Sequence, residues 1–294
     1  MPDARSHKPP IALTIAGSDS GGGAGIQADL KSFHRFGGFG TSVITAITAQ
    51  NTTGVRAIHA IPLDDVTAQL DAVVEDLRPA AFKTGMLATA ALARTVADGV
   101  ARHGLANWVL DPVMVATSGD RLLEVDAEEA LRDELLPHAT LVTPNLEEAA
   151  ILVGRAVRSV DDMEGAAREL VALGTEAALV KGGHLDDGGR PSPIVVDVLY
   201  DGKSVHRWER ERIDTVHTHG TGCTLSAAIA AGLARGRPLR EAVDTALDFL
   251  GRAIAAAPGL GSGRGPVNHF VSPELGASAA RPDGPGTGRG TAPA

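Results

Sequence analysis

The chain has 294 residues, of which 44% are hydrophobic and 21% are charged, and its formal net charge is −9. This composition is ordinary for a globular protein, and the negative charge argues against a nucleic-acid binder, which normally carries a basic face. No segment reaches the roughly 18 apolar residues of a membrane span, and the single cysteine permits no intramolecular disulfide. We therefore expect a cytoplasmic protein that binds neither nucleic acid nor a membrane.

The first part of the chain alternates between apolar strands and amphipathic helices. Residues 1–10 are expected to form a flexible leader. In chain order, the pattern then predicts a strand at 11–16, a helix at 26–36, strands at 39–49 and 55–61, a helix that Asp64 or Asp65 caps and that runs to 77, a strand at 80–83, a helix at 89–103 and a strand at 108–113 that Pro112 interrupts.

The alternation continues through the second part of the chain. The pattern predicts a helix at 127–136, a strand at 140–143, helices at 146–153 and 161–173, a strand at 177–180, strands at 194–200 and 204–208 joined as a hairpin, and helices at 222–234 and 239–256. Residues 276–294 contain mainly Gly, Pro, Ala, Ser and Thr without periodicity, which is typical of a disordered tail.

This order of elements predicts an α/β fold. We expect a single domain over 11–275, with a mostly parallel central sheet, helices on both faces and a small antiparallel hairpin at one edge. In such sheets ligands bind beyond the carboxyl ends of the strands. Residues of Gly, Asp, Asn and Lys follow many of the predicted strands, so we expect the site at that rim.

The segment His219-Gly-Thr-Gly-Cys-Thr-Leu-Ser226 opens an apolar helix with a glycine-rich turn. Free backbone N–H groups at a helix start hold anions, and Gly220 and Gly222 let a ligand approach the backbone closely. The single cysteine, Cys223, lies at this turn, where a helix start is expected to lower its pKa. The alternative interpretation is an ordinary glycine-containing helix start.

A second glycine-rich segment, Gly23-Ala-Gly-Ile-Gln-Ala28, matches the dinucleotide-binding fingerprint with Ala in the last place. The fingerprint also needs an acidic residue after the next strand, and Gln50-Asn51 stands there instead, which disfavours a nicotinamide or flavin enzyme. A phosphate-binding loop of the G-x-x-x-x-G-K-[ST] type is absent from the sequence. We therefore expect the Gly220 turn and Lys181, one of only five lysines, to hold phosphate.

Three oxygen-bearing side chains, those of Asp111, Asn145 and Glu148, follow successive predicted strands. Mg²⁺ is usually bound by one or two carboxylates together with water and phosphate oxygens. The alternative is that Asn145 caps the next helix and Glu148 complements its dipole. Cys223 as a covalent nucleophile, with His217 or His219 as its base, is a further alternative.

These segments together resemble a hydroxymethylpyrimidine/phosphomethylpyrimidine kinase, a family of the ribokinase-like superfamily. The resemblance covers about 11–270 and is carried by these motifs: Thr14-Ile-Ala-Gly-Ser-Asp-Ser20, Gly22-Gly-Ala-Gly-Ile-Gln-Ala-Asp-Leu-Lys31, Ala49-Gln-Asn51, Lys83-Thr-Gly-Met86, Asp111-Pro-Val-Met-Val-Ala-Thr-Ser-Gly119, Thr143-Pro-Asn-Leu-Glu-Glu148, Val180-Lys-Gly-Gly-His184, the Gly220 turn and Gly265-Pro-Val-Asn-His269. Arg264 departs from the pattern, because the family has histidine before Gly265.

The resemblance implies two ATP-dependent phosphorylations, of 4-amino-5-hydroxymethyl-2-methylpyrimidine and then of its monophosphate, in thiamine biosynthesis. It also implies a homodimer and Mg²⁺. By the same resemblance Gln50 recognises the aminopyrimidine. The implied roles of the other residues are substrate binding for Gly17, Asp29, Met86 and Val113, ATP binding for Lys181, Thr221 and Asn145, metal binding for Asp111 and Glu148, and catalysis for Lys181, Gly220, Gly222 and Cys223.

The two phosphorylations make different demands on Cys223. In the first, we expect its thiolate to take the proton of the substrate hydroxyl. In the second, the nucleophile is a phosphate oxygen that is already ionised near neutral pH. Cys223→Ala is therefore expected to slow the first step more than the second.

Three other functions stay open from the sequence alone. A pyridoxal kinase has a similar hydroxymethyl substrate but makes no second transfer. A non-catalytic sensor on the same fold is disfavoured by Lys181 and Cys223, and would show no substrate-dependent ATP turnover. A cysteine hydrolase would be inactivated by thiol alkylation without any need for ATP.

Overall fold

The computed structural model describes residues 8–114, 125–186 and 190–273. Most of the predicted leader and the whole predicted tail lie outside these ranges, as do residues 115–119 of one motif. No helix in the described part of the chain has both the length and the apolar character needed to cross a bilayer.

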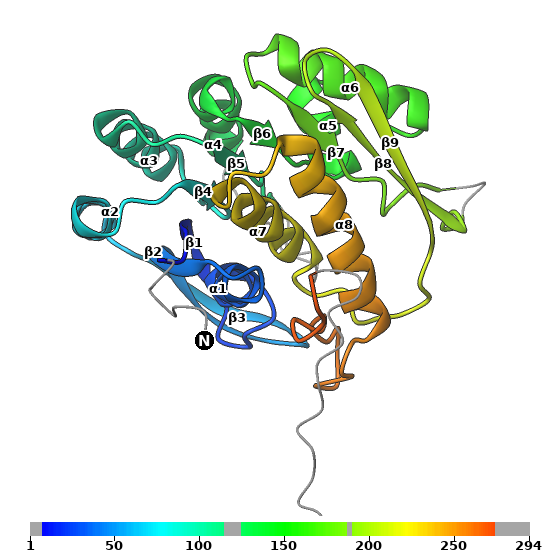
Figure 1. The fold of residues 1–294 in the computed structure, drawn as a ribbon, viewed down its shortest axis with the longest axis horizontal. Helices are drawn as coiled ribbons and strands as arrows, with labels where there is room; N and C mark the ends of the chain where they lie inside the picture. The colour runs from blue at the N-terminus through cyan, green and yellow to red at the C-terminus, as the bar shows by residue number, and fades with distance from the viewer. Residues whose placement is uncertain (1–7, 115–124, 187–189, 274–294) are drawn as a thin grey trace, which may run out of the picture.

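Nine strands form one sheet through the centre of the protein (Figure 1). They are β1 (Ile11–Ser18), β2 (Phe39–Asn51), β3 (Gly54–Ala60), β4 (Ala81–Thr84), β5 (Trp108–Leu110), β6 (Leu141–Val142), β7 (Ala178–Val180), β8 (Ile194–Tyr200) and β9 (Val205–Glu211). Their order is β3-β2-β1-β4-β5-β6-β7-β8-β9. The neighbours β2, β1, β4, β5, β6 and β7 in this order pair in parallel.

Both edges of the sheet are antiparallel. The β8–β9 hairpin at one edge confirms the prediction. At the other edge β3 runs antiparallel to β2, a second antiparallel edge that the prediction did not include. The connection between β2 and β3 is only Thr52 and Thr53, and a turn this short can join only antiparallel strands.

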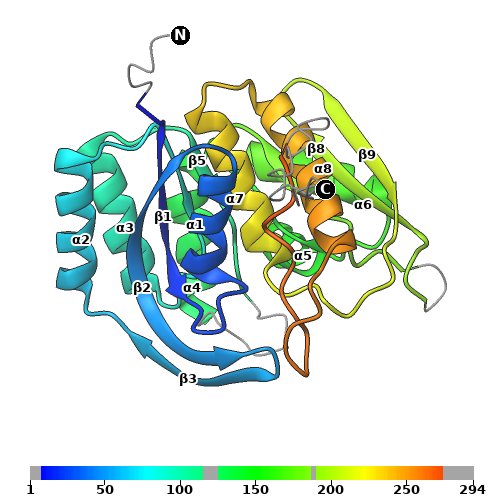
Figure 2. The ribbon, with the colours of Figure 1, turned by 60° about the horizontal axis from the view of Figure 1, so that its bottom comes forward.

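Eight α-helices cover the described sheet, and Figures 1 and 2 show them on its two faces. They are α1 (Gly25–Arg35), α2 (Leu63–Asp76), α3 (Ala90–His103), α4 (Val125–Ala130), α5 (Leu146–Val153), α6 (Val160–Ala172), α7 (Thr221–Ala234) and α8 (Leu239–Ala255). Helices α1, α7 and α8 pack on one face, and α2 to α6 pack on the other. The predicted three-layer α/β fold is therefore confirmed.

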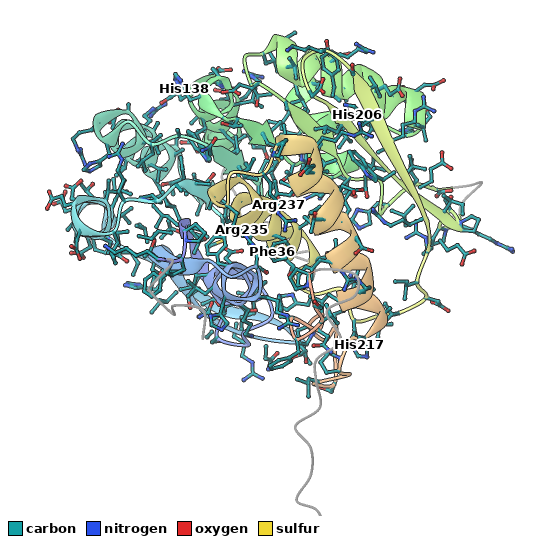
Figure 3. The ribbon with its side chains drawn as sticks, in the orientation of Figure 1. Phe36, His138, His206, His217, Arg235 and Arg237 are labelled. Atoms are coloured by element: carbon teal, nitrogen blue, oxygen red, sulfur yellow. The ribbon has the colours of Figure 1, made fainter. Side chains whose placement is uncertain are left out.

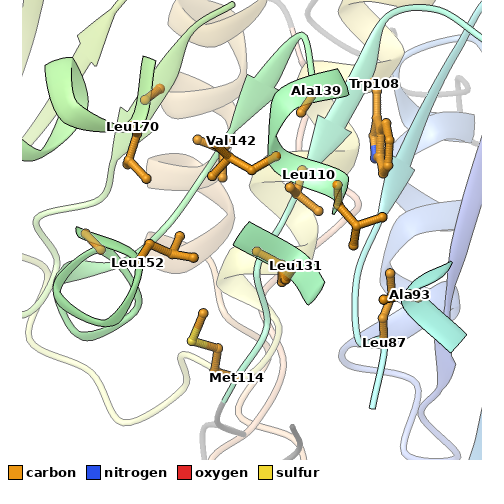
Figure 4. Close-up of a cluster of buried hydrophobic side chains, with 14 of the residues drawn as sticks. Leu87, Ala93, Trp108, Leu110, Met114, Leu131, Ala139, Val142, Leu152 and Leu170 are labelled. Carbon is orange, nitrogen blue, oxygen red and sulfur yellow. The ribbon is translucent and has the colours of Figure 1, made fainter. Parts of the chain in front are cut away.

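Alternation along the strands divides the apolar residues between two cores. In β1, Leu13 and Ile15 belong to the core under α2 to α6, whereas Ala12 belongs to the core under α7 and α8. Figure 4 shows part of the first core, where Leu110 and Val142 meet side chains of the surrounding helices. On the other face, the small side chains of α7 let this buried helix lie close to the sheet.

The ends of α1 and α7 are joined by a long-range contact. The Arg235 guanidinium after α7 donates to the carbonyl oxygen of Phe36 after α1, at 2.9 Å (Figure 3). Helix α7 therefore holds a fixed place against α1, and the amino-terminal ends of both helices reach the same region of the molecule.

Several predicted boundaries were wrong for local reasons. Helix α2 begins after Pro62, so Asp64 and Asp65 lie inside its first turn and neither caps it. Strand β5 ends at Leu110, before Pro112, which cannot donate to a ladder. The helix predicted at 127–136 is divided into α4, a π-helical turn at Leu131–Leu135 and a 3₁₀ turn at Leu136–His138.

Candidate active site

One pocket lies where the carboxyl ends of the central strands meet the start of α7. Of the predicted site residues, ten line it: Gly17, Gln50, Met86, Asp111, Val113, Glu148, Lys181, Gly220, Gly222 and Cys223. The other three, Asp29, Asn145 and Thr221, are not on its described wall. The elements that supply the ten residues are far apart in sequence, so the fold brings them together.

The Gly220 turn is shaped by close contact with the first glycine-rich loop. Gly220 precedes α7 with φ at 79°, in the left-handed region that favours glycine. A Cβ at Gly220 would lie 1.8 Å from the carbonyl oxygen of Gly23, so no other residue fits there. Within the described contacts, the N–H groups of Gly222 and Cys223 have no acceptor, and the first helical bond runs from Thr224 N to Gly220 O. Free N–H groups at a helix start are suited to hold an anion.

The first glycine-rich loop holds an anion of its own. The carboxylate of Asp19 accepts hydrogen bonds from the backbone N–H groups of Gly21, Gly23 and Ala24 at 2.8–3.0 Å. It also accepts one from His219 Nε2 at 2.8 Å. Because these N–H groups are already bonded, the loop offers no phosphate site of the dinucleotide-binding kind. Among the described turns, this leaves the Gly220 turn as the better candidate for phosphate.

Asp19 was missed by the sequence analysis, although a signal was present. An aspartate followed at short spacing by several glycines can bond to their N–H groups, as Asp side chains do in turns. His219 was considered only as a base for Cys223. It is bonded to Asp19 instead, and His217 Nδ1 accepts from the N–H of Gly265 at 3.2 Å. Neither histidine makes a described contact with the thiol, so the cysteine hydrolase lacks a positioned base.

Cys223 lines the pocket together with Gly25 at the start of α1. Burial raises the pKa of this thiol to about 11, while the nearby Lys83 opposes the rise. The expectation that the helix start lowers the pKa of Cys223 is therefore wrong for this structure. Desolvation of the thiolate outweighs the favourable field of the helix.

Lys181 connects two carboxylates close to the start of α7, where a Cβ at Gly222 would lie 3.4 Å from Lys181 Nζ. Its Nζ lies 3.2 Å from Asp111 Oδ1 and 4.0 Å from Glu148 Oε2. Asp111 also accepts hydrogen bonds from the hydroxyls of Thr143 and Ser226. Although burial opposes it, the two ammonium groups around Asp111 hold the pKa of that carboxyl below its usual value. The hydroxyls of Ser226 and Thr143, which bond to Asp111, were not among the site residues predicted from the sequence.

Glu148 has the opposite shift. Burial raises its pKa to about 7; Lys181 opposes the rise and Asp111 adds to it. The alternative interpretation of Asn145 is confirmed, because its side chain accepts from Glu148 N while Glu148 Oε2 accepts from Asn145 N, forming a capping box at the start of α5. One Glu148 oxygen is thus directed to the helix start and the carboxyl group still reaches the pocket.

The donor set suits a magnesium ion held partly by substrate. Within the described residues no group of three or more His, Cys, Asp or Glu side chains could hold a metal. Asp111 and Glu148 are two carboxyl groups that both line the pocket and lie on either side of the Lys181 ammonium, at 3.2 Å and 4.0 Å. Two carboxylates with water and phosphate oxygens form an ordinary Mg²⁺ site.

Another part of the pocket lining carries the side chains expected to bind substrate. A register shift between Ala49 and Gln50 interrupts the regular β2–β3 pairing, which continues from Gln50 opposite Val55. Ser20 Oγ bonds to both the N–H and the carbonyl oxygen of Gln50. The Gln50 amide makes only a 3.3 Å contact, with Thr48, among the described residues. Its hydrogen-bonding groups therefore have capacity for a ligand.

Gly17 and Met86 form a flat part of the same wall. A Cβ at Gly17 would lie 2.6 Å from the Met86 methyl carbon, so the methionine lies directly over the glycine. Asp29, in contrast, is fully buried and lies 3.1 Å from Lys83 Nζ. The structure places it next to the pocket and not on its surface.

Comparison with known proteins shows the family of the chain. The chain matches the family model described as phosphomethylpyrimidine kinase over residues 19–268. A hydroxymethylpyrimidine/phosphomethylpyrimidine kinase of Rhizobium meliloti (strain 1021) is 54% identical over 263 residues, which are 88% of this chain and 97% of the relative.

Two solved structures show the same fold. An ADP complex of Bacillus subtilis pyridoxal kinase is 40% identical, with a TM-score of 0.81 and coverage of 89% of this chain and 98% of the other. A phosphomethylpyrimidine kinase from Clostridium difficile 630 is also 40% identical, with a TM-score of 0.74 and coverage of 84% and 100%. The predicted ribokinase-like fold is thereby confirmed.

Proposed function

The chain belongs to the phosphomethylpyrimidine kinase family, and we propose that the pocket described above carries out both of its phosphoryl transfers. The protein is a kinase that phosphorylates hydroxymethylpyrimidine and then phosphomethylpyrimidine in thiamine biosynthesis. The observation that carries the proposed site is that one pocket is lined both by Gln50, whose amide has capacity for a ligand, and by Gly222 and Cys223, whose N–H groups are free at the start of α7. The amide can recognise a base and the N–H groups an anion.

The aminopyrimidine lies against Gln50 in this proposal. A primary amide has one acceptor and two donors side by side, which match a ring nitrogen and its neighbouring amino group. Gly17 and Met86 provide the flat apolar surface for the ring, and Val113 closes the wall. Asp29 acts from beneath, because it is not on the pocket surface.

ATP is the proposed phosphoryl donor, and the ADP complex of the similar pyridoxal kinase supports this. In this proposal the γ-phosphoryl group of ATP lies at the N–H groups of Gly222 and Cys223, next to the Lys181 ammonium. Thr221 and Asn145 are proposed to contact the nucleotide. Phosphoryl transfer depends mainly on positioning and on neutralising charge, and these groups supply both.

Asp111 and Glu148 would hold Mg²⁺. The ion supplies neutralisation of the charge on the phosphate oxygens when bound. Lys181 already balances part of the negative charge of these two carboxylates, so it also keeps the wall from repelling the nucleotide.

Cys223 is the proposed base of the first phosphorylation. Its sulfur takes the proton of the substrate hydroxyl as the hydroxyl oxygen attacks the γ-phosphorus. The second transfer needs no such base, because its nucleophile is an ionised phosphate oxygen. Gly220 contributes by fixing the turn that carries both the sulfur and the anion-binding N–H groups.

The experiment that tests the function is turnover of ATP and Mg²⁺ with hydroxymethylpyrimidine, its monophosphate and pyridoxal supplied separately, with the products resolved by mass. We expect diphosphate from the monophosphate. Phosphorylation of pyridoxal alone would contradict the proposed site. It would favour the alternative function in vitamin B6 salvage, which is suggested by the similarity to a pyridoxal kinase.

We also propose a cytoplasmic location and a homodimer, following the family resemblance. Small molecules, namely the two pyrimidines and ATP, are the proposed partners. A single species of twice the chain mass in light scattering would support the dimer.

A further inference from the structure

The direction of the Lys181 side chain depends on how the chain is held just after β7. Strand β7 pairs with β8 as far as Val180, and Lys181 is the next residue. Lys181 N donates to the carbonyl oxygen of Pro144 at 2.8 Å, which fixes the peptide group on the amino side of the lysine. A group that fixes the peptide on the carboxyl side would complete the control of its direction.

That group is the carboxylate of Asp197 on β8. Its Oδ1 accepts the N–H of Gly182 at 2.9 Å, and the residue is only 3% exposed. A Cβ at Gly182 would lie 1.8 Å from the carbonyl oxygen of Val196, so this residue lies directly against β8 and only glycine fits there. A side chain of β8 therefore holds the chain beyond the last paired residue of β7.

Two arginines support the same segment. Arg210 on β9 forms an ion pair with Oδ2 of Asp197, so both oxygens of this carboxylate are bonded. Arg212, which follows β9, donates from Nη1 to the carbonyl oxygen of Gly183 at 2.8 Å. A buried ion pair that served stability alone could be replaced by apolar residues at little cost. Here one oxygen of the pair is bonded to the peptide next to Lys181, which is an orienting contact.

The position of the Lys181 ammonium matters because several groups of the pocket lie around it. Its Nζ lies 3.2 Å from Asp111 Oδ1 and 4.0 Å from Glu148 Oε2. The same Nζ is 3.4 Å from the place of a Cβ at Gly222, in the first turn of α7. A displacement of the Lys181 backbone would change all of these distances together.

We propose that Asp197 is a positioning residue for the kinase reaction, because its carboxylate fixes the Gly182 peptide and thereby aims the Lys181 ammonium at the transferred phosphoryl group. Arg210 holds the carboxylate in this orientation. The inference rests on the proposed function, in which Lys181 neutralises charge on that group. The β8–β9 hairpin thus contributes to the site, although none of its described residues lines the pocket (Figure 1).

Binding of the non-hydrolysable methylene analogue of ATP with Mg²⁺, measured by isothermal titration calorimetry on the full-length protein, tests this contact without turnover. Asp197→Leu removes the acceptor of the Gly182 N–H, whereas Asp197→Asn keeps an oxygen in the same place. Glu164→Leu is the matched control, because Glu164 also pairs with an arginine of β9, Arg207, and its described contacts are not with the 181–184 segment. Thermal unfolding verifies that each variant folds.

We expect Asp197→Leu to weaken binding of the analogue about tenfold and to lower kcat of both phosphorylations about tenfold, because a small displacement of a charged group is costly in a preorganised site. The KM for hydroxymethylpyrimidine should stay within about twofold, because Gln50 is untouched. Asp197→Asn and Glu164→Leu should stay within about threefold of the unchanged protein in every one of these quantities. A merely structural role would lower the melting temperature without this division between kcat and KM.

Lys181→Met shows whether the effect passes through the lysine. If it does, Asp197→Leu added to Lys181→Met should weaken binding no further, since residues that act together are not additive. Should Asp197→Leu not fold, Arg210→Met takes its place, because it removes the partner that orients the carboxylate and should show the same loss and the same dependence on Lys181.

A full additional loss in the double variant would overturn the proposal, and so would unchanged binding in a folded Asp197→Leu variant. Failure of the proposed function gives a different result. If the unchanged protein binds no analogue, the proposed nucleotide site is wrong, and this inference is wrong with it.

Discussion

Cys223 illustrates how two effects compete at one side chain. A helix start favours the thiolate, whereas burial disfavours it, and burial prevails by raising the pKa to about 11. The thiolate is thus a minor species at neutral pH. A base with this pKa works at neutral pH only when its sulfur is held next to the reacting hydroxyl, which is the substrate position that we propose.

This pKa predicts how the first phosphorylation depends on pH. Because the thiolate fraction grows about tenfold per unit below a pKa of about 11, kcat/KM for hydroxymethylpyrimidine should rise by about that factor per unit between pH 7 and 9. The second phosphorylation should be nearly flat above pH 7. Initial rates with each substrate measure both profiles, and Cys223→Ala should remove the slope of the first. Parallel profiles for the two steps would contradict the assignment of Cys223 as base.

His269 predicts a different pH effect, on stability. It is buried against Thr224 Oγ1 at 2.9 Å, and burial, with a smaller contribution from Lys31, lowers its pKa to about 4. An unfolded chain takes up this proton near pH 6.5, whereas the folded protein takes it up only near pH 4. His269 therefore favours the folded state fully above pH 6.5, and about 3 kcal/mol of that stability is lost as the pH falls to 4.

Denaturant unfolding between pH 7 and 4 measures this effect. His269→Gln, whose amide can still bond to Thr224 but does not titrate, should lose clearly less stability over that interval. An unchanged pH slope in the variant would assign the acid sensitivity to other groups.

At the scale of elements, the interlocking of two turns is the feature on which the site depends most. The Gly220 turn touches the loop at Gly23, and Asp19 and His219 join the same two segments. The start of α7 is therefore positioned by the loop that follows β1. A change in either turn moves the anion-binding N–H groups.

Gly220→Ala should slow both phosphorylations at least a hundredfold. A Cβ there would lie 1.8 Å from Gly23 O, so the turn must shift. The N–H groups of Gly222 and Cys223 would then no longer point at the proposed phosphate position. Gly251→Ala, at a half-buried position of α8 where a Cβ meets nothing within 4 Å, is the control and should be active. Steady-state rates for both substrates test this; a loss confined to one step would be evidence against a shared anion site.

Much of this arrangement could be predicted from the sequence. Strand β1 and helix α5 are visible in local patterns, because apolar periodicity and the Asn145 cap are local signals. The two residues between β2 and β3 are too few for a crossover between parallel strands, so β3 must run antiparallel to β2. The prediction from apolar patterns did not take the length of this connection into account. Asp29 was placed by resemblance on the substrate, and only the packing of Thr14 and Lys83 around it shows that it lies beneath the surface.

The shifts of pKa could not be predicted in the same way. The pKa values of Cys223 and Glu148 depend on burial and on charges supplied by distant strands. A sequence pattern gives the identity of a titratable group but not its solvent exposure or the distance to its neighbours. The same reason explains why Asp19 was overlooked, since its partner His219 is 200 positions away.

At the scale of the whole molecule, the two edges of the sheet differ in character. Strand β9 carries charged residues along most of its length, which discourages pairing with another chain. Strand β3 has a single Arg and exposes Ile58, 46% accessible, beside a turn of the pocket wall. The β3 edge is the better candidate for contact with a second copy.

If the proposed homodimer forms at that edge, Ile58→Lys should convert it to a monomer. The matched control is Ile194→Lys on β8, near the opposite edge, where the isoleucine is 37% accessible. Light scattering after size-exclusion chromatography distinguishes the two masses. A dimer that survives Ile58→Lys and dissociates with Ile194→Lys would place the interface on the other side of the sheet.

The long span of the contacts around the pocket has a consequence for the newly made chain. Asp19 and His219 are 200 positions apart, and Arg35 bonds to the carbonyl of Val271 across 236 positions. Domains fold from the amino terminus during synthesis, and contacts this distant form late. A chain interrupted before position 219 contains Gln50 but lacks His219 and the turn that precedes α7. Such a fragment lacks residues that line the pocket, so the site cannot be complete until the start of α7 has been made.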